Sequence, residues 1–335
     1  MIKPLISVIM PMYNAERYVE ESIKSVLDQS FMNFELIIVN DCSTDNSIQK
    51  IFSFNDSRII LVHNKKNLGI SKSLNKAIDI SRGEYIARID ADDLMKKTRL
   101  ENQYKFLEKF TDIGVVGSAI EVIGDFGKYC HRYPKEDRYI KYSMFFENSF
   151  AHPSIMCRKN LLIKAGRYRN NYKYVEDWDL WLRLSKLTKF HNLQKPLTIY
   201  RAHNGSSCYK YTEIQSCSKI SLLKNIFYEN KLPFKSYIYS NNFIFSYKNL
   251  ILLYAWLTDI KNSIKADKYD LIIFHKILYR QYLYYLSKVN QDFVKVISFY
   301  FKNPYKYDSL FCKIPIIIYL IFRYRVNKKR LLQSK

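Results

Sequence analysis

Three carboxylates crowd into the four-residue stretch Asp90-Ala91-Asp92-Asp93, directly after the largely apolar residues 84–89. Two carboxylates one residue apart at the rim of a cleft suit a hard divalent cation, which leaves coordination positions open for substrate phosphates. A solvated turn is the alternative, because 31 Asp and Glu in 335 residues produce such spacings by chance. The predicted buried strand before the acids favours a metal or nucleotide site.

The elements that must position these acids alternate between strand and helix. The apolar runs that predict buried strands are 5–11, 34–40, 58–63 and 84–89. The segments that predict helices between them are 16–29, a short stretch capped by Ser43 or Thr44 and running through Ile51, and 70–81, which Gly83 ends. Continuous apolar strands alternating with helices indicate a parallel sheet covered on both faces. Since such sheets bind ligands at the carboxyl ends of their strands, the residues after each strand are expected to form one site.

Two residues after the first strands have side chains that suit a nucleotide. Tyr13 follows Pro11 at the end of the first strand, where an aromatic face can stack on a base; the alternative is one more tyrosine among 29. Asp41 follows the second strand and can accept a hydrogen bond from a base or ribose, or serve an Asx-turn or helix cap. For Asp45 the Asx-turn or helix cap is the better interpretation.

Lys72 is a candidate for diphosphate binding. It lies in the first turns of the predicted helix 70–81, and Gly69 before it suits a tight turn into that helix. A lysine there adds to the positive potential of a helix N-terminus, which attracts anions. A solvated lysine is the alternative.

Two further candidates lie beyond residue 94, where helices are predicted at 95–109 and 176–187 and a strand at 113–123. Asp177 follows Glu176 at the start of a helix and is flanked by tryptophans, which would raise the pKa of its carboxyl group and make it a general base. First-turn acids also stabilise any helix through its dipole. His203 can supply an imidazole ligand to the metal or be structural.

Seven motifs together resemble the family 2 glycosyltransferases, the inverting nucleotide-sugar enzymes of bacterial surface polysaccharide and lipopolysaccharide synthesis. They lie within about residues 4–205 and read SVIMPMYN, FELIIVNDCSTDNS, NLGISKSLNKAI, GEYIARIDADD, AHPSIMCRKNLLIKAGRY, VEDWDLWLRL and YRAHNGSS. The resemblance implies a GT-A fold, an α/β Rossmann-like arrangement with a mixed, mostly parallel sheet and helices on both faces. The catalytic domain would span 1–210, with a nucleotide-binding half at 1–93 and an acceptor half at 94–210.

On the donor side, the resemblance implies that Tyr13 stacks on the base, typically uracil, and that Pro11 shapes the strand end. Asp41 would hydrogen-bond the base, and Asp90 would approach the ribose. Asn40 replaces one acid of the usual acidic pair here, and Cys42 replaces the common glycine, which leaves the identity of the nucleotide open.

For the chemistry, the resemblance implies that Asp92 binds Mn²⁺ or Mg²⁺, that His203 closes over this ion, and that Asp177 deprotonates the acceptor hydroxyl. The expected reaction is the inverting transfer of one hexose or N-acetylhexosamine from a UDP-sugar to a saccharide or lipid-linked saccharide in capsule, O-antigen or lipooligosaccharide synthesis. No QxxRW-like motif and no run of 18 apolar residues is present, which argues against a processive, membrane-spanning synthase.

Composition and motifs limit the cellular location and the other functional classes that the chain could belong to. The six cysteines form no CxxC pair and no signal peptide is visible, which predicts a cytoplasmic, reduced protein. A sugar nucleotidyltransferase would carry a Gly-rich phosphate loop near the N-terminus, which PMYNAERY lacks. A non-catalytic nucleotide-binding protein stays open. No nucleic-acid-binding motif accompanies the net charge of +23, so nucleic acid is not the expected partner.

The chain changes character from about residue 211. Residues 211–335 hold 21 Lys and Arg against 7 Asp and Glu, and they predict a basic helical extension. Its most apolar segments, 243–257 and 314–322, suit an interface with anionic lipid, which would place the protein peripherally on the inner face of the cytoplasmic membrane. Helical packing against the catalytic domain is the equal alternative.

Overall fold

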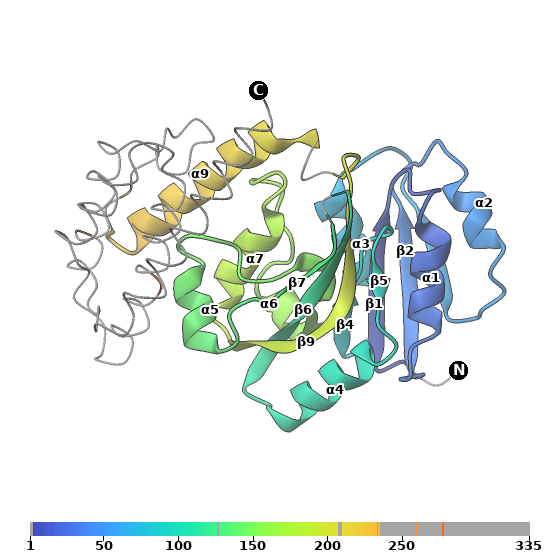
Figure 1. Ribbon diagram of the computed structural model, residues 1–335, viewed down its shortest axis with the longest axis horizontal. Coiled ribbons are helices and arrows are strands. Elements are labelled where there is room, and N and C mark those ends of the chain that lie inside the picture. The colour runs from blue at the N-terminus through green and yellow to red at the C-terminus, as the bar shows by residue number, and fades with distance from the viewer. Residues whose placement is uncertain are drawn as a thin grey trace, which may run out of the picture. The chain divides into compact units, whose positions relative to one another are not determined.

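The computed structural model describes residues 3–125, 127–206, 210–232 and 234, with Asp259 and Ile277 (Figure 1). The apolar segments 243–257 and 314–322 therefore lie outside the described residues. The chain divides into two compact units, Met1–Leu222 and Leu223–Lys335, and the first contains the whole sheet. The division at residue 210 stays a prediction.

The described strands form one nine-stranded sheet with the order β3-β2-β1-β4-β8-β6-β9-β5, and β7 pairs with β6. The strands are β1 (Ile6–Met12), β2 (Phe34–Asn40), β3 (Ile59–His63), β4 (Tyr85–Arg88), β5 (Leu94–Met95), β6 (Ile113–Gly124), β7 (Tyr129–His131), β8 (Met156–Arg158) and β9 (Lys189–Ala202). Strands β1 to β4 are mutually parallel, β8 runs antiparallel between β4 and β6, and β9 is parallel to β6. This is the mixed, mostly parallel sheet that the sequence predicts.

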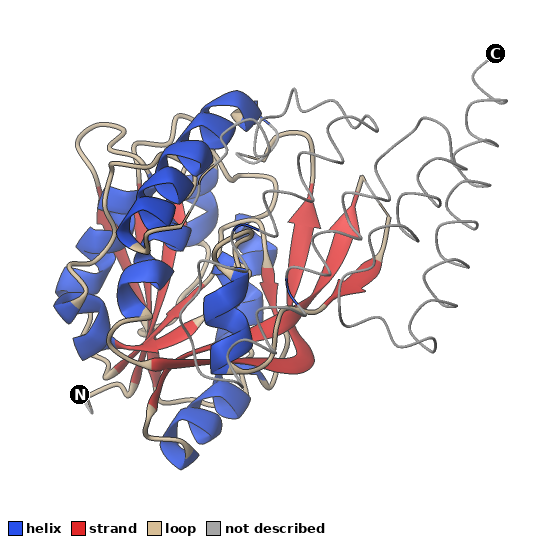
Figure 2. Ribbon diagram, turned by 90° about the vertical axis from the view of Figure 1, so that its left-hand side faces the viewer, coloured by secondary structure: helices blue, strands red, loops and turns tan. Residues whose placement is uncertain are grey.

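Helices cover both faces of this sheet (Figure 2). The helices are α1 (Val19–Leu27), α2 (Ser47–Phe52), α3 (Ile70–Ile80), α4 (Arg99–Lys109), α5 (Asp137–Ser143), α6 (Lys159–Lys164), α7 (Glu176–Leu184) and α9 (Thr212–Glu229), with a 3-10 turn, η1 (His152–Ser154). The apolar faces of α1 and α4 join the core cluster that holds every second residue of β1, from Ile6 to Met12. Helix α3 contacts β1 and β2 and completes the layer arrangement.

The register of the parallel strands brings their carboxyl ends to one edge. Met12 is level with Asn40, and Asn40 is level with His63. Arg88 pairs with Ile9, so the chain leaves β4 beside the last residues of β1. The turns that follow β1, β2, β3 and β4 therefore lie at the same edge, as the strand pattern predicts.

Two local predictions were wrong. Helix α2 begins at Ser47, with neither Ser43 nor Thr44 as its cap, because Asp45 organises the turn: its Oδ1 accepts hydrogen bonds from the Ser47 N–H at 3.1 Å and the Ser47 hydroxyl at 2.5 Å. Gly83 lies beyond the end of α3. A Cβ atom there would meet the Ser7 nitrogen at 2.5 Å, so this glycine permits close packing against β1.

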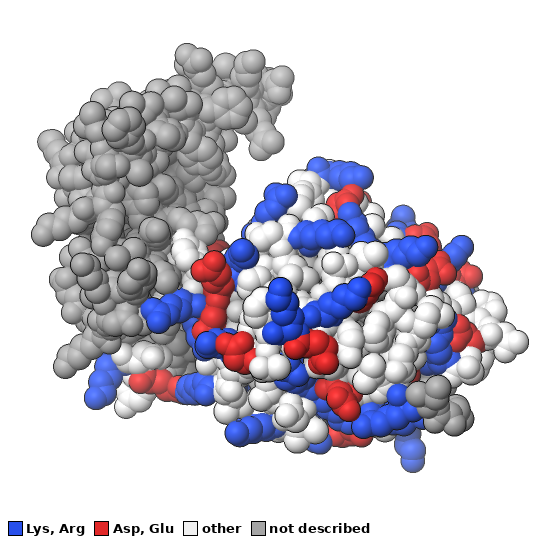
Figure 3. Space-filling model, turned by 90° about the horizontal axis from the view of Figure 1, so that it is seen from below, with Lys and Arg blue, Asp and Glu red and all other residues white. Residues whose placement is uncertain are grey.

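The charged side chains of the first unit are mixed in sign. Figure 3 shows Asp and Glu interspersed among Lys and Arg over one face of the described part. Many are paired, such as Lys105 with Glu101 at 2.6 Å and Lys189 with Asp112 at 2.8 Å. Among the helices that the structure describes, none combines the length and apolar character that crossing a bilayer requires.

Candidate active site

The loops after β1 and β2 are fastened to each other. The Asn14 N–H donates to the Ser43 hydroxyl at 3.0 Å, and the Thr44 N–H donates to Asn14 Oδ1 at 2.8 Å. Asn14 has a φ of 48°, a left-handed conformation that asparagine tolerates better than most residues. Next to it, Tyr13 leaves 52% of its surface exposed at the carboxyl end of β1, just after the half-buried Pro11. An exposed aromatic ring on a loop that is held in place can stack on a nucleotide base.

Asp41 is buried, and its carboxylate shapes the loop before α3. Its Oδ1 accepts hydrogen bonds from Asn64 Nδ2 at 2.7 Å and from the Leu68 N–H at 2.8 Å, and its Oδ2 accepts one from the Gly69 N–H at 2.8 Å. Both oxygens are therefore engaged within the chain. A contact between Asp41 and a base stays a prediction.

Lys72 is exposed in the first turn of α3. Gly69 is the N-cap of this helix, and its φ of 85° lies in the region that glycine adopts most readily. The amine of Lys76, one turn later, donates to the His63 carbonyl at 2.7 Å and to Asn64 Oδ1 at 3.0 Å. The diphosphate role of Lys72 stays a prediction, and its position at a helix N-terminus suits it.

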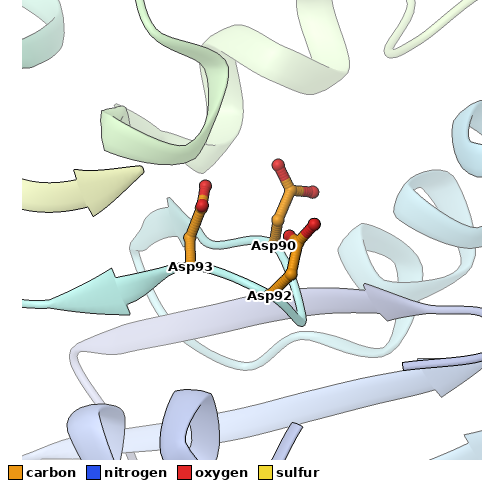
Figure 4. A group of neighbouring side chains, drawn as sticks. All are labelled: Asp90, Asp92 and Asp93. Atoms are coloured by element: carbon orange, nitrogen blue, oxygen red, sulfur yellow. The ribbon is translucent and has the colours of Figure 1, made fainter. Parts of the chain in front are cut away.

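Asp90, Asp92 and Asp93 rise on the same side of the turn between β4 and β5 (Figure 4). One oxygen of each lies within 4.8 Å of the others. Asp90 is held by Arg88, whose side chain is 2% exposed. The guanidinium group donates to both carboxylate oxygens, to Oδ2 at 2.6 Å. Arg88 thus fixes the orientation of Asp90 from within the sheet.

The pKa values of two of these acids reflect their crowding. Burial, opposed by the charge of Arg88 and assisted by that of Asp92, raises the pKa of Asp90 to about 6. Burial, then Asp92 and Asp90, raise the pKa of Asp93 well above its ordinary value. Asp93 Oδ2 is buried without a hydrogen-bond partner. A set of crowded oxygens with an unsatisfied buried member fits the ligand preference of Mn²⁺ or Mg²⁺.

His203 lies against this cluster. Its Nε2 is 3.0 Å from Asp92 Oδ2, and its ring packs against Tyr18, with the ring centroids 5.3 Å apart. The strand β9 brings it there, because the Arg201 N–H donates to Asp93 Oδ1 at 2.8 Å. The structure thus joins the two residues for which the sequence predicts metal binding, and the ligand role of each stays a prediction.

The predicted base lies at the start of α7. Asp177 Oδ2 accepts a hydrogen bond from Asn148 Nδ2 at 2.6 Å, and its Oδ1 accepts one from the Trp178 N–H at 2.8 Å. Burial raises the pKa of Asp177 in spite of both donors, and burial followed by the charge of Asp177 raises that of Glu176 to about 7. Asp177 is also near enough to raise the pKa of Asp90. The base candidate and the metal candidates therefore share one electrostatic environment.

Sequence reasoning missed two residues of this site. Arg88 carried a signal, since it is a cation inside an otherwise apolar strand. Asn148 carried none, because its partner Asp177 lies 29 residues away and no periodicity connects them.

Comparisons with known proteins identify the family of this chain. The model of the family described as "Glycosyl transferase family 2" matches residues 7–200. An uncharacterized glycosyltransferase of Haemophilus influenzae is 33% identical over 68% of this chain and 76% of its own length. The O-antigen biosynthesis glycosyltransferase WbnJ of Escherichia coli is 33% identical over 66% of this chain and 89% of its own.

Solved structures show the same fold. Staphylococcus aureus TarS 1–349, in complex with UDP-GlcNAc, superposes with a TM-score of 0.57 at 19% identity, covering 98% of this chain and 92% of its own. The mannosyltransferase PcManGT from Pyrobaculum calidifontis, in complex with GDP-Man and Mn²⁺, gives a TM-score of 0.54 at 17% identity, covering 92% and 89%. The sheet is that of a GT-A glycosyltransferase, and the chain belongs to glycosyltransferase family 2.

Proposed function

We propose that this glycosyltransferase moves a single hexose or N-acetylhexosamine from a UDP-sugar to a saccharide or lipid-linked saccharide acceptor, with inversion at the anomeric carbon. The observation that carries the proposal is the contact between Asp92 and His203, with Asp177 close enough to act on the pKa of Asp90. Candidate metal ligands and a candidate base thereby share one electrostatic environment. A sugar nucleotidyltransferase has no support from the family match, and a non-catalytic binder is an outcome of the tests below.

The donor is assigned to the edge formed by β1 and β2. Tyr13 would stack on the base, Asp41 would hold the loop beside it, and Lys72 would face the diphosphate. UDP is proposed because the solved TarS relative binds UDP-GlcNAc and the Escherichia coli relative WfaP is a UDP-Glc-dependent glucosyltransferase. WfaP is 31% identical over 66% of this chain.

Asp92 and His203 would hold the cation, and Asp90, fixed by Arg88, would approach the ribose or the metal. A Mn²⁺ or Mg²⁺ ion bound there would neutralise the charge that develops on the leaving diphosphate. His203 directly follows Ala202, the last residue of β9, and its Nε2 lies 3.0 Å from Asp92 Oδ2.

Asp177 would take the proton from the acceptor hydroxyl as its oxygen attacks the anomeric carbon. Attack from the face opposite the diphosphate inverts the configuration and needs one carboxylate base, without a covalent intermediate. A raised pKa brings a carboxylate closer to the operating pH and makes it a better proton acceptor. Asn148 orients this carboxylate from the side.

The acceptor is proposed to belong to cell-surface glycan synthesis, because WbnJ acts in O-antigen biosynthesis and WfaP on a diphosphoundecaprenol-linked sugar. A cytoplasmic location, peripheral on the inner membrane face, is proposed from the basic surplus of residues 211–335.

The decisive experiment measures UDP release from a panel of UDP-sugars, with Mn²⁺ and with EDTA, in the wild-type chain and in Asp92→Ala. We expect metal-dependent release from one sugar that falls by about three orders of magnitude in the variant. Asp112→Ala, which removes a surface acid paired with Lys189, is the control. Release that withstands both EDTA and Asp92→Ala would contradict the metal site.

The base is tested with Asp177→Asn, which keeps the shape of the side chain. We expect transfer to fall by about a thousandfold or more while the dissociation constant of UDP stays within about twofold. Near-normal transfer in this variant would remove Asp177 from the base role. UDP binding without turnover in the wild-type chain, with every sugar and acceptor of the panel, would favour the non-catalytic binder.

A further inference from the structure

One face at the start of α9 contacts the segment that carries Glu176 and Asp177, the first two of the three acids of α7. Tyr211, just before α9, stacks on Tyr174 with ring centroids 4.6 Å apart and planes 9° from parallel. Gln215 donates from Nε2 to the Tyr174 carbonyl at 3.0 Å. The Lys219 amine lies 5.7 Å from the ring centre of Trp178.

The spacing of these contacts is regular on both sides. Tyr211, Gln215 and Lys219 follow one another at intervals of four residues and so share one helix face. Tyr174 and Trp178 are also four residues apart, and Glu176 and Asp177 lie between them. The contacts with α9 therefore lie immediately before Glu176 and immediately after Asp177.

The segment needs such a support, because its backbone is strained. Tyr174 has a φ of 65°, in the left-handed region that bulky residues rarely adopt. Such residues persist where the surrounding structure fixes them, and they gather at functional sites. Here the support is the stack on the ring and the hydrogen bond on the carbonyl of the same residue.

We propose that Tyr211 and Gln215 are positioning residues for the general base, and that the start of α9 is thereby a working part of the active site. This rests on the proposed function, in which Asp177 is the base. The two residues act on Asp177 through Tyr174. They hold the backbone of Tyr174 in the conformation from which α7 begins. All of these residues lie in the first compact unit, which runs through Leu222.

The test uses the full chain with Tyr211→Ala, Gln215→Ala and the conservative Tyr211→Phe, which keeps the ring. Tyr228→Ala is the matched control, because it makes the same change on the same helix at a side chain that is 84% exposed. Hydrogen exchange is followed at residues 172–178 and, as an internal reference, at 36–41 and 85–90. Steady-state release of UDP gives kcat and KM, and titration with UDP and Mn²⁺ gives the dissociation constant.

In Tyr211→Ala and Gln215→Ala we expect exchange at 172–178 to rise by about tenfold or more, with the reference segments unchanged. We expect kcat to fall by about tenfold or more while the UDP dissociation constant stays within about twofold, because the donor edge is untouched. Tyr228→Ala should behave as the wild type. Tyr211→Phe keeps the stack but loses the hydroxyl that hydrogen-bonds Tyr174, so its exchange and kcat should lie between those of the wild type and Tyr211→Ala. Unchanged exchange at 172–178, or an unchanged kcat despite faster exchange, overturns the proposal.

This failure is distinguishable from failure of the proposed function. If Asp177→Asn abolishes transfer and the α9 variants keep their kcat, the base stands and the positioning role falls. If Asp177→Asn transfers normally, the base assignment falls and with it the role proposed for Tyr211 and Gln215. The exchange measurement needs no turnover, so it decides the structural part of the proposal with any donor.

Discussion

His203 Nε2 lies 3.0 Å from Asp92 Oδ2, although 111 residues separate them in the chain. The contact depends on β9, which pairs with β5 just after the acidic turn and holds Asp93 through the Arg201 N–H. The candidate metal site is therefore completed from the far end of the catalytic fold.

The first prediction concerns this histidine. His203→Ala should raise the Mn²⁺ concentration for half-maximal UDP release by about 10- to 100-fold, with partial recovery at saturating Mn²⁺. The measurement is a Mn²⁺ titration of UDP release. His191→Ala, which removes a ring packed on Phe106, is the control. An unchanged titration curve would place His203 outside the metal site.

The second prediction concerns Asp41. Asp41→Ala should leave the N–H groups of Leu68 and Gly69 without their acceptor and lower the free energy of unfolding by about 2 kcal/mol or more. UDP binding should weaken as well, because the loop before α3 loses its anchor. Thermal denaturation and UDP titration measure the two effects. Asp28→Ala, at an exposed helix end, should change neither.

The third prediction concerns the pH dependence of transfer. Asn148 lowers the pKa of Asp177 by donating to its carboxylate, so Asn148→Ala should raise that pKa further. A base works only when deprotonated, and the acid limb of the kcat profile should therefore move to higher pH, with the rate recovering above it. A kcat profile between pH 5 and 9 measures this shift. A loss that is equal at every pH would show that Asn148 acts only on the fold.

The fourth prediction concerns stability. The pKa of Glu176 rises from an ordinary 4.5 to about 7 on folding, chiefly through burial. The folded chain therefore keeps a proton that the unfolded chain loses, so the stability contributed by this group is present below pH 4.5 and is lost as the pH rises to about 7. Glu176→Gln should be nearly neutral at pH 4 and stabilising by up to about 3 kcal/mol at pH 8.

Urea denaturation of wild type and Glu176→Gln at pH 4, 6 and 8 measures this difference. Glu101→Gln is the control of opposite sign, because Lys105 and Ser30 lower the pKa of Glu101. Its contribution is present above its ordinary pKa and is lost as the pH falls. A Glu176→Gln variant that gains no stability between pH 4 and pH 8 would contradict the raised pKa.

The sequence predicts which residues lie at the carboxyl edge of the sheet, because the end of each apolar run marks the end of a strand. Asp41 and Asp90 could be placed at one edge for this reason, and the parallel register of β1, β2 and β4 confirms that placement. Tyr13 is found exposed at the same edge. The motifs of glycosyltransferase family 2 added the roles, which spacing alone does not supply.

The contacts that complete the site could not be predicted from the sequence, because they join segments that no local pattern connects. Asp41 was read as a ligand for a base, and its hydrogen bonds to Asn64, Leu68 and Gly69 depend on a loop fold that composition does not specify. The same holds for the hydrogen bond from Asn148 to Asp177. Each is a tertiary contact whose geometry is decided by packing.

The first compact unit ends at Leu222, beyond the last residue that the family model matches, Tyr200. A chimera cut at the family boundary would therefore graft α7 onto a foreign tail without Tyr211 and Gln215. Exchange of C-terminal tails between relatives should keep this chain through Leu222. The junction, more than the tail, would then decide whether the hybrid turns over.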